Sequence, residues 1–206
     1  MGHRLREAVV VSTARTGLTK SYRGGMNITH GAAMGGHVIK HAVERAGVDP
    51  NEIEDAIIGC AIQEGATGGN IARQAVLRAG LPATVAGATV NRFCASGLQA
   101  IVSAAQRIIV DNVDVMVSGG LESISLAQTE HMNTFRAVDE DLKAKIPGVY
   151  YSMIKTAEVV GERYQVSREK QDEYALQSQV RMADAQRAGK FDDEIVPFKT
   201  EMLLVD

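Results

Sequence analysis

The residue types best suited to chemistry gather in the segment Val90–Ala100, which reads VNRFCASGLQA. Its cysteine, Cys94, carries a thiol, and a thiolate is a strong nucleophile toward carbonyl carbon. The small and β-branched residues of 84–90 predict a buried strand just before it. Apolar residues recur after it at helical spacing, which predicts a helix buried around much of its circumference. They are Leu98, Ile101, Val102, Ala105, Ile108 and Ile109.

Cys94 is therefore expected on a turn that joins a core strand to a core helix. The unpaired N–H groups and the dipole at a helix start favour an anion, here a thiolate. Ser96 and Gly97 suit a tight turn, because one is small and polar and the other lacks a Cβ. The arrangement is similar to the strand–nucleophile–helix elbow of hydrolases. The alternative is an inert buried thiol, the usual state of a free cysteine.

Strands and helices alternate through the first part of the chain, which predicts an α/β fold with a mainly parallel sheet. The expected strands are 8–12, 55–60, 84–90 and 113–117, and the expected helices are 34–46, 71–79 and 98–109. From 121 to 151 no periodicity persists, which predicts an inserted loop region. The later elements expected are a helix at 156–164, a helix from Ser167 to Gly189 buried through Leu176, Val180 and Ala183, and a strand at 194–198.

The composition indicates an ordinary soluble protein. The chain has 206 residues and a net charge of −3, which argues against nucleic acid or an anionic membrane as a partner. The first residues, Met1–Glu7, lack the apolar core of a signal peptide, and no apolar run was expected to reach membrane-spanning length. Two cysteines make no disulfide framework, so we expect a reducing, cytoplasmic location.

Other candidate sites are weaker. His37 and His41 are four residues apart on a predicted helix, but two imidazoles without a third ligand are poor support for a metal site. We expect both to be solvated, and we expect no metal. The glycine-rich segment 24–36 lacks the spacing of a phosphate-binding loop. Cys60 ends a predicted strand without the Ser-Gly turn, so we expect it to serve packing.

The segment NRFCASGLQA resembles the nucleophile motif of the thiolase family, in the form typical of degradative 3-ketoacyl-CoA thiolases. Similar thiolase segments are Gly68–Gln74, Gly119–Ser123, Thr156–Glu158 and Phe191–Pro197. The resemblance implies a layered fold whose N-terminal half is a βαβαβαββ unit with an inserted loop domain. We expect residues 1–120 to form the α/β core and 121–206 to form an incomplete loop-domain region with the following helix and strand.

The resemblance also implies roles. Cys94 would be the catalytic residue that accepts an acyl group from a 3-ketoacyl-CoA, and its N–H would help bind the oxyanion. Met153 would bind the coenzyme A substrate beside the acyl and pantetheine groups, and Glu122 would be structural. Coenzyme A and acyl-CoA would be substrates, with no prosthetic group. The protein would be a homodimer or homotetramer, with the loop 63–70 reaching a neighbouring subunit.

The sequence departs from the family pattern in two places. Ser152-Met153 stands where acetoacetyl-CoA-specific members often carry His-Met, and together with Asn91-Arg92-Phe93 this favours the broader-chain degradative branch, with the chain length left open. The family's catalytic histidine, its asparagine and its second cysteine lie in motifs that these 206 residues do not contain. We therefore expect an N-terminal portion, inactive alone. The alternatives are a ketoacyl synthase and a non-catalytic acyl-CoA-binding or assembly module.

Overall fold

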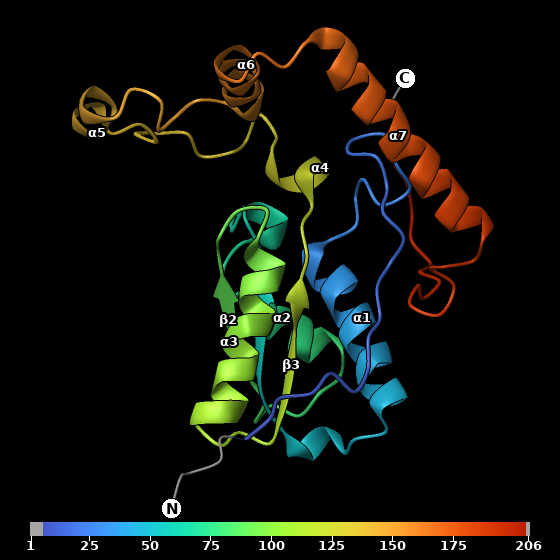
Figure 1. The fold of residues 1–206 in the computed structure, drawn as a ribbon. Coiled ribbons are helices and arrows are strands. Elements are labelled where there is room, and N and C mark those ends of the chain that lie inside the picture. Colours follow the sequence, from blue (N-terminus) through green and yellow to red (C-terminus); the bar gives the residue numbers. More distant parts are fainter. Residues whose placement is uncertain (1–5, 205–206) are drawn as a thin grey trace, which may run out of the picture. The chain divides into compact units, whose positions relative to one another are not determined.

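The computed structural model describes residues 6–204, so the N-terminal stretch assessed for a signal peptide lies partly outside the described residues. The chain groups into two compact units. One comprises the chain up to Met132 with the segment from Glu194, and the other runs from Asn133 to Asp193 (Figure 1). The division at residue 120 stays a prediction, although this grouping places 121–132 and 194–204 with the first unit.

A three-stranded parallel sheet forms the centre of the first unit (Figure 1). Its strands are β1 (Ile53–Gly59), β2 (Ala86–Val90) and β3 (Val115–Gly120), in the order β2-β1-β3. The register pairs the last residue of each strand, because Gly59 lies opposite both Val90 and Gly120. The predicted parallel α/β architecture is confirmed, with fewer strands than expected. All three carboxyl ends meet at one edge.

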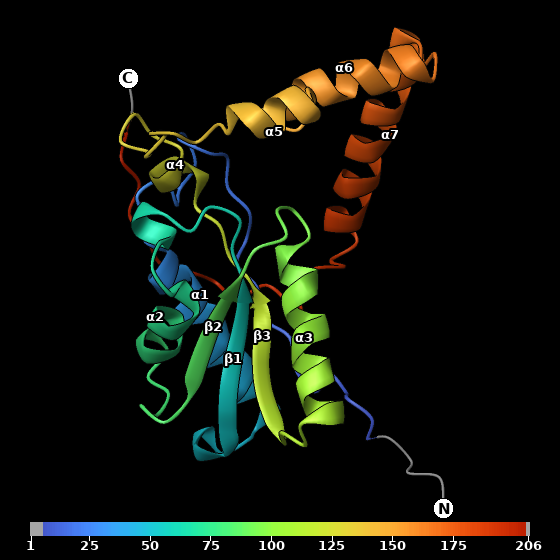
Figure 2. The ribbon, with the colours of Figure 1, turned by 90° about the vertical axis from the view of Figure 1, so that its left-hand side faces the viewer.

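Helices cover the two faces of this sheet differently (Figure 2). On one face lie α1 (Gly31–Ala46) and α2 (Ile71–Arg78), and on the other lies α3 (Ser96–Val110). Strand residues alternate between the faces, so Ala56 and Ile58 join the main apolar core on the α1 and α2 side. The rest of that core is Ile39, Val43, Ile53, Ala72, Ala75, Val76, Leu81 and Val85.

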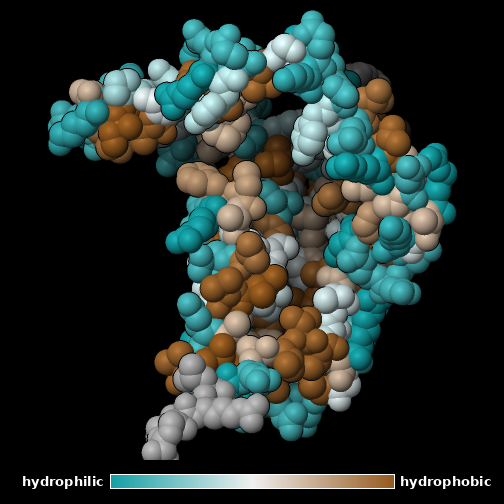
Figure 3. Space-filling view, in the orientation of Figure 1, coloured by the Kyte–Doolittle hydropathy of each residue, from teal (hydrophilic) through white to brown (hydrophobic). Residues whose placement is uncertain are grey.

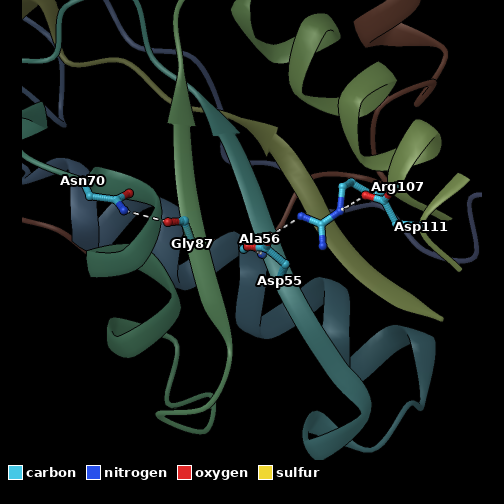
Figure 4. Close-up of polar contacts among 6 residues, drawn as sticks. All are labelled: Asp55, Ala56, Asn70, Gly87, Arg107 and Asp111. Carbon is cyan, nitrogen blue, oxygen red and sulfur yellow. Dashed lines mark hydrogen bonds and ion pairs between the residues drawn. The ribbon is translucent and has the colours of Figure 1, made fainter. Parts of the chain in front are cut away.

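Local signals place the start of α2 and the end of α1 where the sequence predicted them, whereas α1 and α3 begin two to three residues earlier than predicted. The side chain of Asn70 caps α2 by accepting from the N–H of Arg73 at 3.2 Å. Gly47 ends α1 in the left-handed region, with φ of 66°. Polar side chains then fasten helices to the sheet: Asn70 donates to the Gly87 carbonyl at 2.6 Å, and Arg107 of α3 pairs with Asp55 of β1 at 3.2 Å (Figure 4).

Two predicted strands are wrong. Residues 8–12 form no strand, and the side chains of Val9, Val10 and Val11 are 68–75% exposed. A continuous apolar run predicts a strand that is covered on both faces. Among the described residues, however, no strand pairs with residues 8–12. The segment 194–198 is reduced to a single bridge, in which the N–H of Arg15 donates to the Glu194 carbonyl at 2.9 Å and that of Val196 to the Arg15 carbonyl at 2.8 Å.

The prediction that α3 is buried around much of its circumference is also wrong. Its small residues Ala100 and Ala104 are buried against the sheet, whereas Leu98 is 66% and Val110 69% exposed. Apolar surface is visible over the face that carries α3 and β3 (Figure 3). By length and composition alone, Phe93–Val110 could cross a membrane, contrary to expectation. In this structure the helix instead packs on the sheet through one face.

The second unit contains α5 (Glu140–Lys145), α6 (Met153–Arg163) and α7 (Arg168–Arg187). The first unit also contains three short helices: the 3-10 helices η1 (Pro50–Glu52) and η2 (Gly65–Thr67), and α4 (Ile124–Ala127). Ser167 caps α7 as predicted, by accepting from the N–H of Lys170. The predicted buried face of α7 is wrong, because Leu176 is 66% and Val180 49% exposed. Spacing predicts an apolar stripe, but burial requires a layer that covers it.

The prediction that His37 and His41 are both solvated is wrong for His37. Its ring lies 4.6 Å from the rings of His41 and Phe198, and its Nε2 is buried. Phe198 belongs to the segment that returns to the first unit. That segment therefore packs on α1, and further along it Leu203 bonds with Asn27 through its backbone N–H and carbonyl, at 2.9 and 2.7 Å.

Candidate active site

Cys94 lies on the turn between β2 and α3, as the sequence predicted. Its side chain is exposed, so the alternative of an inert buried thiol does not describe this residue. The helix begins two residues later, at Ser96. Because β2 is parallel to its neighbour β1, the turn leaves the sheet at the edge where all three strands end. This edge is where α/β proteins commonly carry their sites.

Hydrogen bonds close the turn around the cysteine. The hydroxyl of Ser96 accepts from the N–H of Arg92 at 2.8 Å and donates to the Phe93 carbonyl at 2.6 Å. Phe93, the residue before Cys94, has φ of 48°, in the left-handed region that non-glycine residues seldom adopt. Such a conformation persists only where its surroundings hold it, and it is concentrated at functional sites.

Glycines allow the turn to approach the strand ends. A Cβ on Gly59, the last residue of β1, would lie 2.2 Å from the carbonyl carbon of Ser96. A Cβ on Gly120, the last residue of β3, would lie 3.1 Å from the Cα of Gly97. No side chain larger than hydrogen fits at Gly59 without moving the turn. The turn that carries Cys94 and the start of α3 therefore pack against the ends of two strands.

The start of α3 provides an electrostatic setting for an anion. Its N-cap residue is Ala95, which makes no side-chain cap hydrogen bond, and the N–H of Ser96 donates to the Phe93 carbonyl at 3.0 Å. The first-turn N–H groups of an α-helix have no intrahelical acceptor, and they carry the positive end of the helix dipole. A helix start of this kind beside a thiol suits a developing oxyanion.

Cys60 has the opposite environment. Its side chain is 1% exposed, and its sulfur lies 3.5 Å from a carboxylate oxygen of Glu122. Burial, followed by the charge of Glu122, raises the pKa of the Cys60 thiol to about 11. The thiol is therefore protonated at neutral pH and serves packing, as the sequence predicted.

The carboxylate of Glu122 accepts hydrogen bonds from backbone N–H groups. One carboxylate oxygen accepts from the N–H of Ala61 at 2.8 Å and from that of Ile62 at 3.2 Å. These bonds agree with the structural role that the resemblance implied. Sequence reasoning did not single out Asn91, whose side chain donates to the Ala61 carbonyl at 2.8 Å. The sequence offers one local clue to Asn91: it lies two residues before Phe93, the spacing at which an asparagine side chain can form an Asx turn.

Met153 is the first residue of α6 and is 71% exposed. Ser152 precedes it and caps the helix by accepting from the N–H of Lys155 at 3.2 Å. Met153 belongs to the second unit, so its role beside a coenzyme A thioester stays a prediction, as does the catalytic role of Cys94. Among residues 6–204, no group of three metal-ligating side chains comes together.

Comparison with known proteins identifies the family. A family model described as the thiolase N-terminal domain matches residues 8–203. The chain is 43% identical to a 3-ketoacyl-CoA thiolase of Bacillus subtilis over 193 residues, which covers 94% of this chain and 49% of that protein. It is 40% identical to an acetyl-CoA acetyltransferase of Cupriavidus necator over 203 residues, which covers 94% and 51% of the two chains.

A solved structure agrees with this assignment. The crystal structure of the Bacillus anthracis acetyl-CoA acetyltransferase superposes with a TM-score of 0.81 at 33% identity, and the match covers 97% of this chain and 53% of that one. The chain thus spans about half the length of the proteins that it matches. With a thiol at the edge of a parallel sheet and a domain match along nearly all its length, the chain belongs to the thiolase family and corresponds to its N-terminal portion.

Proposed function

We propose that the protein that contains this chain is an acyl-CoA acyltransferase of the thiolase type. It would cleave a 3-ketoacyl-CoA with coenzyme A, or run the reverse condensation of two acyl-CoA molecules. The observation that carries this proposal is the exposed thiol of Cys94 beside the start of α3, in a chain of this family. Relatives named 3-ketoacyl-CoA thiolase and acetyl-CoA acetyltransferase support the same reaction class.

The proposed reaction has two half-reactions. The Cys94 thiolate attacks the C3 carbonyl of the ketoacyl-CoA, and the C2–C3 bond breaks with its electron pair on C2. C2 takes up the proton that a base removed from Cys94, and acetyl-CoA leaves. The sulfur of coenzyme A then attacks the acyl-cysteine thioester, its proton passes to the base, and Cys94 leaves as the thiolate. The helix start stabilises the developing oxyanions.

Further parts of the proposal rest on the family resemblance. Met153 would lie beside the acyl and pantetheine groups, coenzyme A would be the substrate without a prosthetic group, and the protein would be a cytoplasmic homodimer or homotetramer. The exposed apolar face of α3 is in keeping with association. Light scattering on the full-length protein tests the oligomer, and a monomer at micromolar concentration would contradict it.

The 206-residue chain lacks the groups that the resemblance assigns to proton transfer. The resemblance assigns the base and the second acid–base group to motifs that this chain lacks. Each such group typically contributes on the order of 10²–10⁴ in rate. We therefore propose that residues 1–206 alone turn over negligibly. The runner-up function, a non-catalytic acyl-CoA-binding or assembly module, predicts that the full-length protein is inactive as well.

The test compares two proteins, the verified 206-residue chain and the full-length product of the reading frame that contains it. Thiolysis of acetoacetyl-CoA and of a medium-chain 3-ketoacyl-CoA is measured for each. We expect turnover by the full-length product, its loss in Cys94→Ser, and its retention in Cys60→Ala. Peptide mapping after quenching should locate the acyl group on Cys94. A full-length product that is folded and inactive would favour the runner-up.

A further inference from the structure

We propose that Asn91 and Glu122 are positioning residues for Cys94, which they hold through the backbone of Ala61 and Ile62. This inference rests on the proposed function only in taking Cys94 as the nucleophile. Neither residue is proposed to touch a substrate. Glu122 bonds to the N–H groups of Ala61 and Ile62, and Asn91 bonds to the Ala61 carbonyl. This loop segment begins two residues after β1 ends at Gly59.

Glu122 fixes this loop segment from the β3 side. Its Oε2 accepts from the N–H groups of Ala61 and Ile62 at 2.8 and 3.2 Å, while its Oε1 lies 3.5 Å from the sulfur of Cys60. Backbone bonds lock the surrounding residues: the N–H of Cys60 donates to the Val90 carbonyl, and that of Leu121 donates to the Gly59 carbonyl, each at 3.0 Å. The segment is thus held on the end of the sheet by a charged acceptor, the stronger kind of hydrogen bond.

Asn91 connects the fixed segment to the nucleophile turn. Its Nδ2 donates to the Ala61 carbonyl at 2.8 Å, and its Oδ1 accepts from the N–H of Phe93 at 2.8 Å. Phe93 is the residue with φ of 48° that directly precedes Cys94. Glu122 therefore holds the backbone of Ala61 and Ile62, and Asn91 connects that backbone to Phe93. Because Phe93 directly precedes Cys94, its conformation affects where the Cys94 side chain points.

Asn91 is suited to a test because it is exposed, so its substitution leaves the apolar core intact. Three variants of the full-length product are compared with the parent. Asn91→Ala removes both bonds, and Asn91→Asp keeps an acceptor for Phe93 but loses the donor to Ala61. Glu122→Gln replaces one accepting oxygen with an amide donor that cannot accept from an N–H. Asn51→Ala is the matched control, since Asn51 is an exposed asparagine before the amino end of β1 whose side chain donates to Asp49, two residues away.

Two quantities are measured on each folded variant, the rate constant of Cys94 alkylation by iodoacetamide and the values of kcat and KM for thiolysis. We expect Asn91→Ala and Glu122→Gln to change the alkylation rate constant and to lower kcat on the order of 10- to 100-fold with KM nearly unchanged, because a small displacement of a nucleophile costs this much. Asn91→Asp should fall between Asn91→Ala and the parent. Asn51→Ala should match the parent in both quantities.

The inference is overturned if folded Asn91→Ala retains the parent's alkylation rate constant, or if only its melting temperature changes, which is what a merely structural role predicts. Should Glu122→Gln fail to fold, the two Asn91 variants decide the outcome. If the parent shows no thiolysis, the proposed function fails separately. The alkylation rate constants then decide the positioning role by themselves.

Discussion

The backbone of Ser96 lies directly against the Cα of Gly59, so close that a Cβ at residue 59 would come within 2.2 Å of the Ser96 carbonyl carbon. The end of β1 and the start of α3 thus share a contact that only glycine permits. Cys94 lies two residues before Ser96, so this contact constrains the backbone next to Cys94 relative to the end of β1.

Replacing Gly59 by alanine should therefore displace the nucleophile turn. We expect Gly59→Ala to lower the free energy of unfolding by about 1–3 kcal/mol, since the added methyl overlaps the backbone of Ser96 and Gly97. Urea denaturation of the two proteins gives this value. Gly119→Ala is the control, because a Cβ at Gly119 meets nothing within 4 Å. Equal losses in both variants would refute the contact.

Cys94 should be alkylated far in advance of Cys60. Cys94 is exposed, whereas Cys60 is buried with a pKa of about 11, so at pH 7 its thiolate is scarce as well as inaccessible. Peptide mapping after limited iodoacetamide treatment of the native protein measures the ratio. Labelling in denaturant should equalise the two sites and serves as the control. Preferential modification of Cys60 in the native state would contradict the assignment.

The ion pair of Arg107 should contribute measurably to stability. Its guanidinium bridges Asp55 at 3.2 Å and Asp111 at 2.6 Å (Figure 4), and the Asp55 side chain is only 13% exposed. Arg107→Met leaves that carboxylate without its cation, and we expect a loss of about 1–3 kcal/mol in the free energy of unfolding. Arg168→Met removes an exposed pair with Asp172 and should cost less than about 1 kcal/mol. Denaturation midpoints of the two variants decide between these values.

The contact between α1 and the returning segment should weaken in acid. Burial, followed by the charge of His41, lowers the pKa of His37, and Lys40 acts in the same direction. The carbonyls of Val196 and Pro197 oppose the shift, although Nε2 makes no hydrogen bond of ordinary geometry. Because the pKa of His37 is lowered in the folded state, neutral His37 contributes its full stabilisation above pH 6.5. That contribution is lost as the pH falls through the folded-state pKa.

Hydrogen exchange of residues 194–204 between pH 5 and 8 measures this weakening. We expect protection to fall below about pH 6.5 in the parent. His37→Phe keeps a ring against Phe198 but does not titrate, so its protection should stay flat with pH. An equally steep acid loss in His37→Phe would assign the effect to other groups.

Much of this protein was determined by local sequence. The helix caps at Asn70 and Ser167, the end of α1 at Gly47 and the strand–turn–helix around Cys94 were all predicted, because each depends on contacts within a few residues. The family also followed from the motif around Cys94. These features need no knowledge of what covers them.

Burial depended on what lies across from a segment. The apolar runs at 8–12, on α3 and on α7 were expected to be covered, yet Val10 is 75% and Leu176 66% exposed. Periodicity identifies an apolar face, but whether that face is buried depends on a layer contributed by distant parts of a protein. The sequence did not predict the burial of His37 for the same reason: the ring of Phe198, 161 residues away in the chain, packs against it only in the folded structure.

The contacts around the turn of Cys94 were decided by tertiary structure. Asn91 and Ala61 are 30 residues apart, and Glu122 is 61 residues from Ala61, so no local pattern joins them. They meet because parallel strands bring their carboxyl ends to one edge of the sheet. The sequence by itself determined that Cys94 follows a strand and precedes a helix. Only the pairing of β1 with β2 and β3 decided which side chains meet beside it.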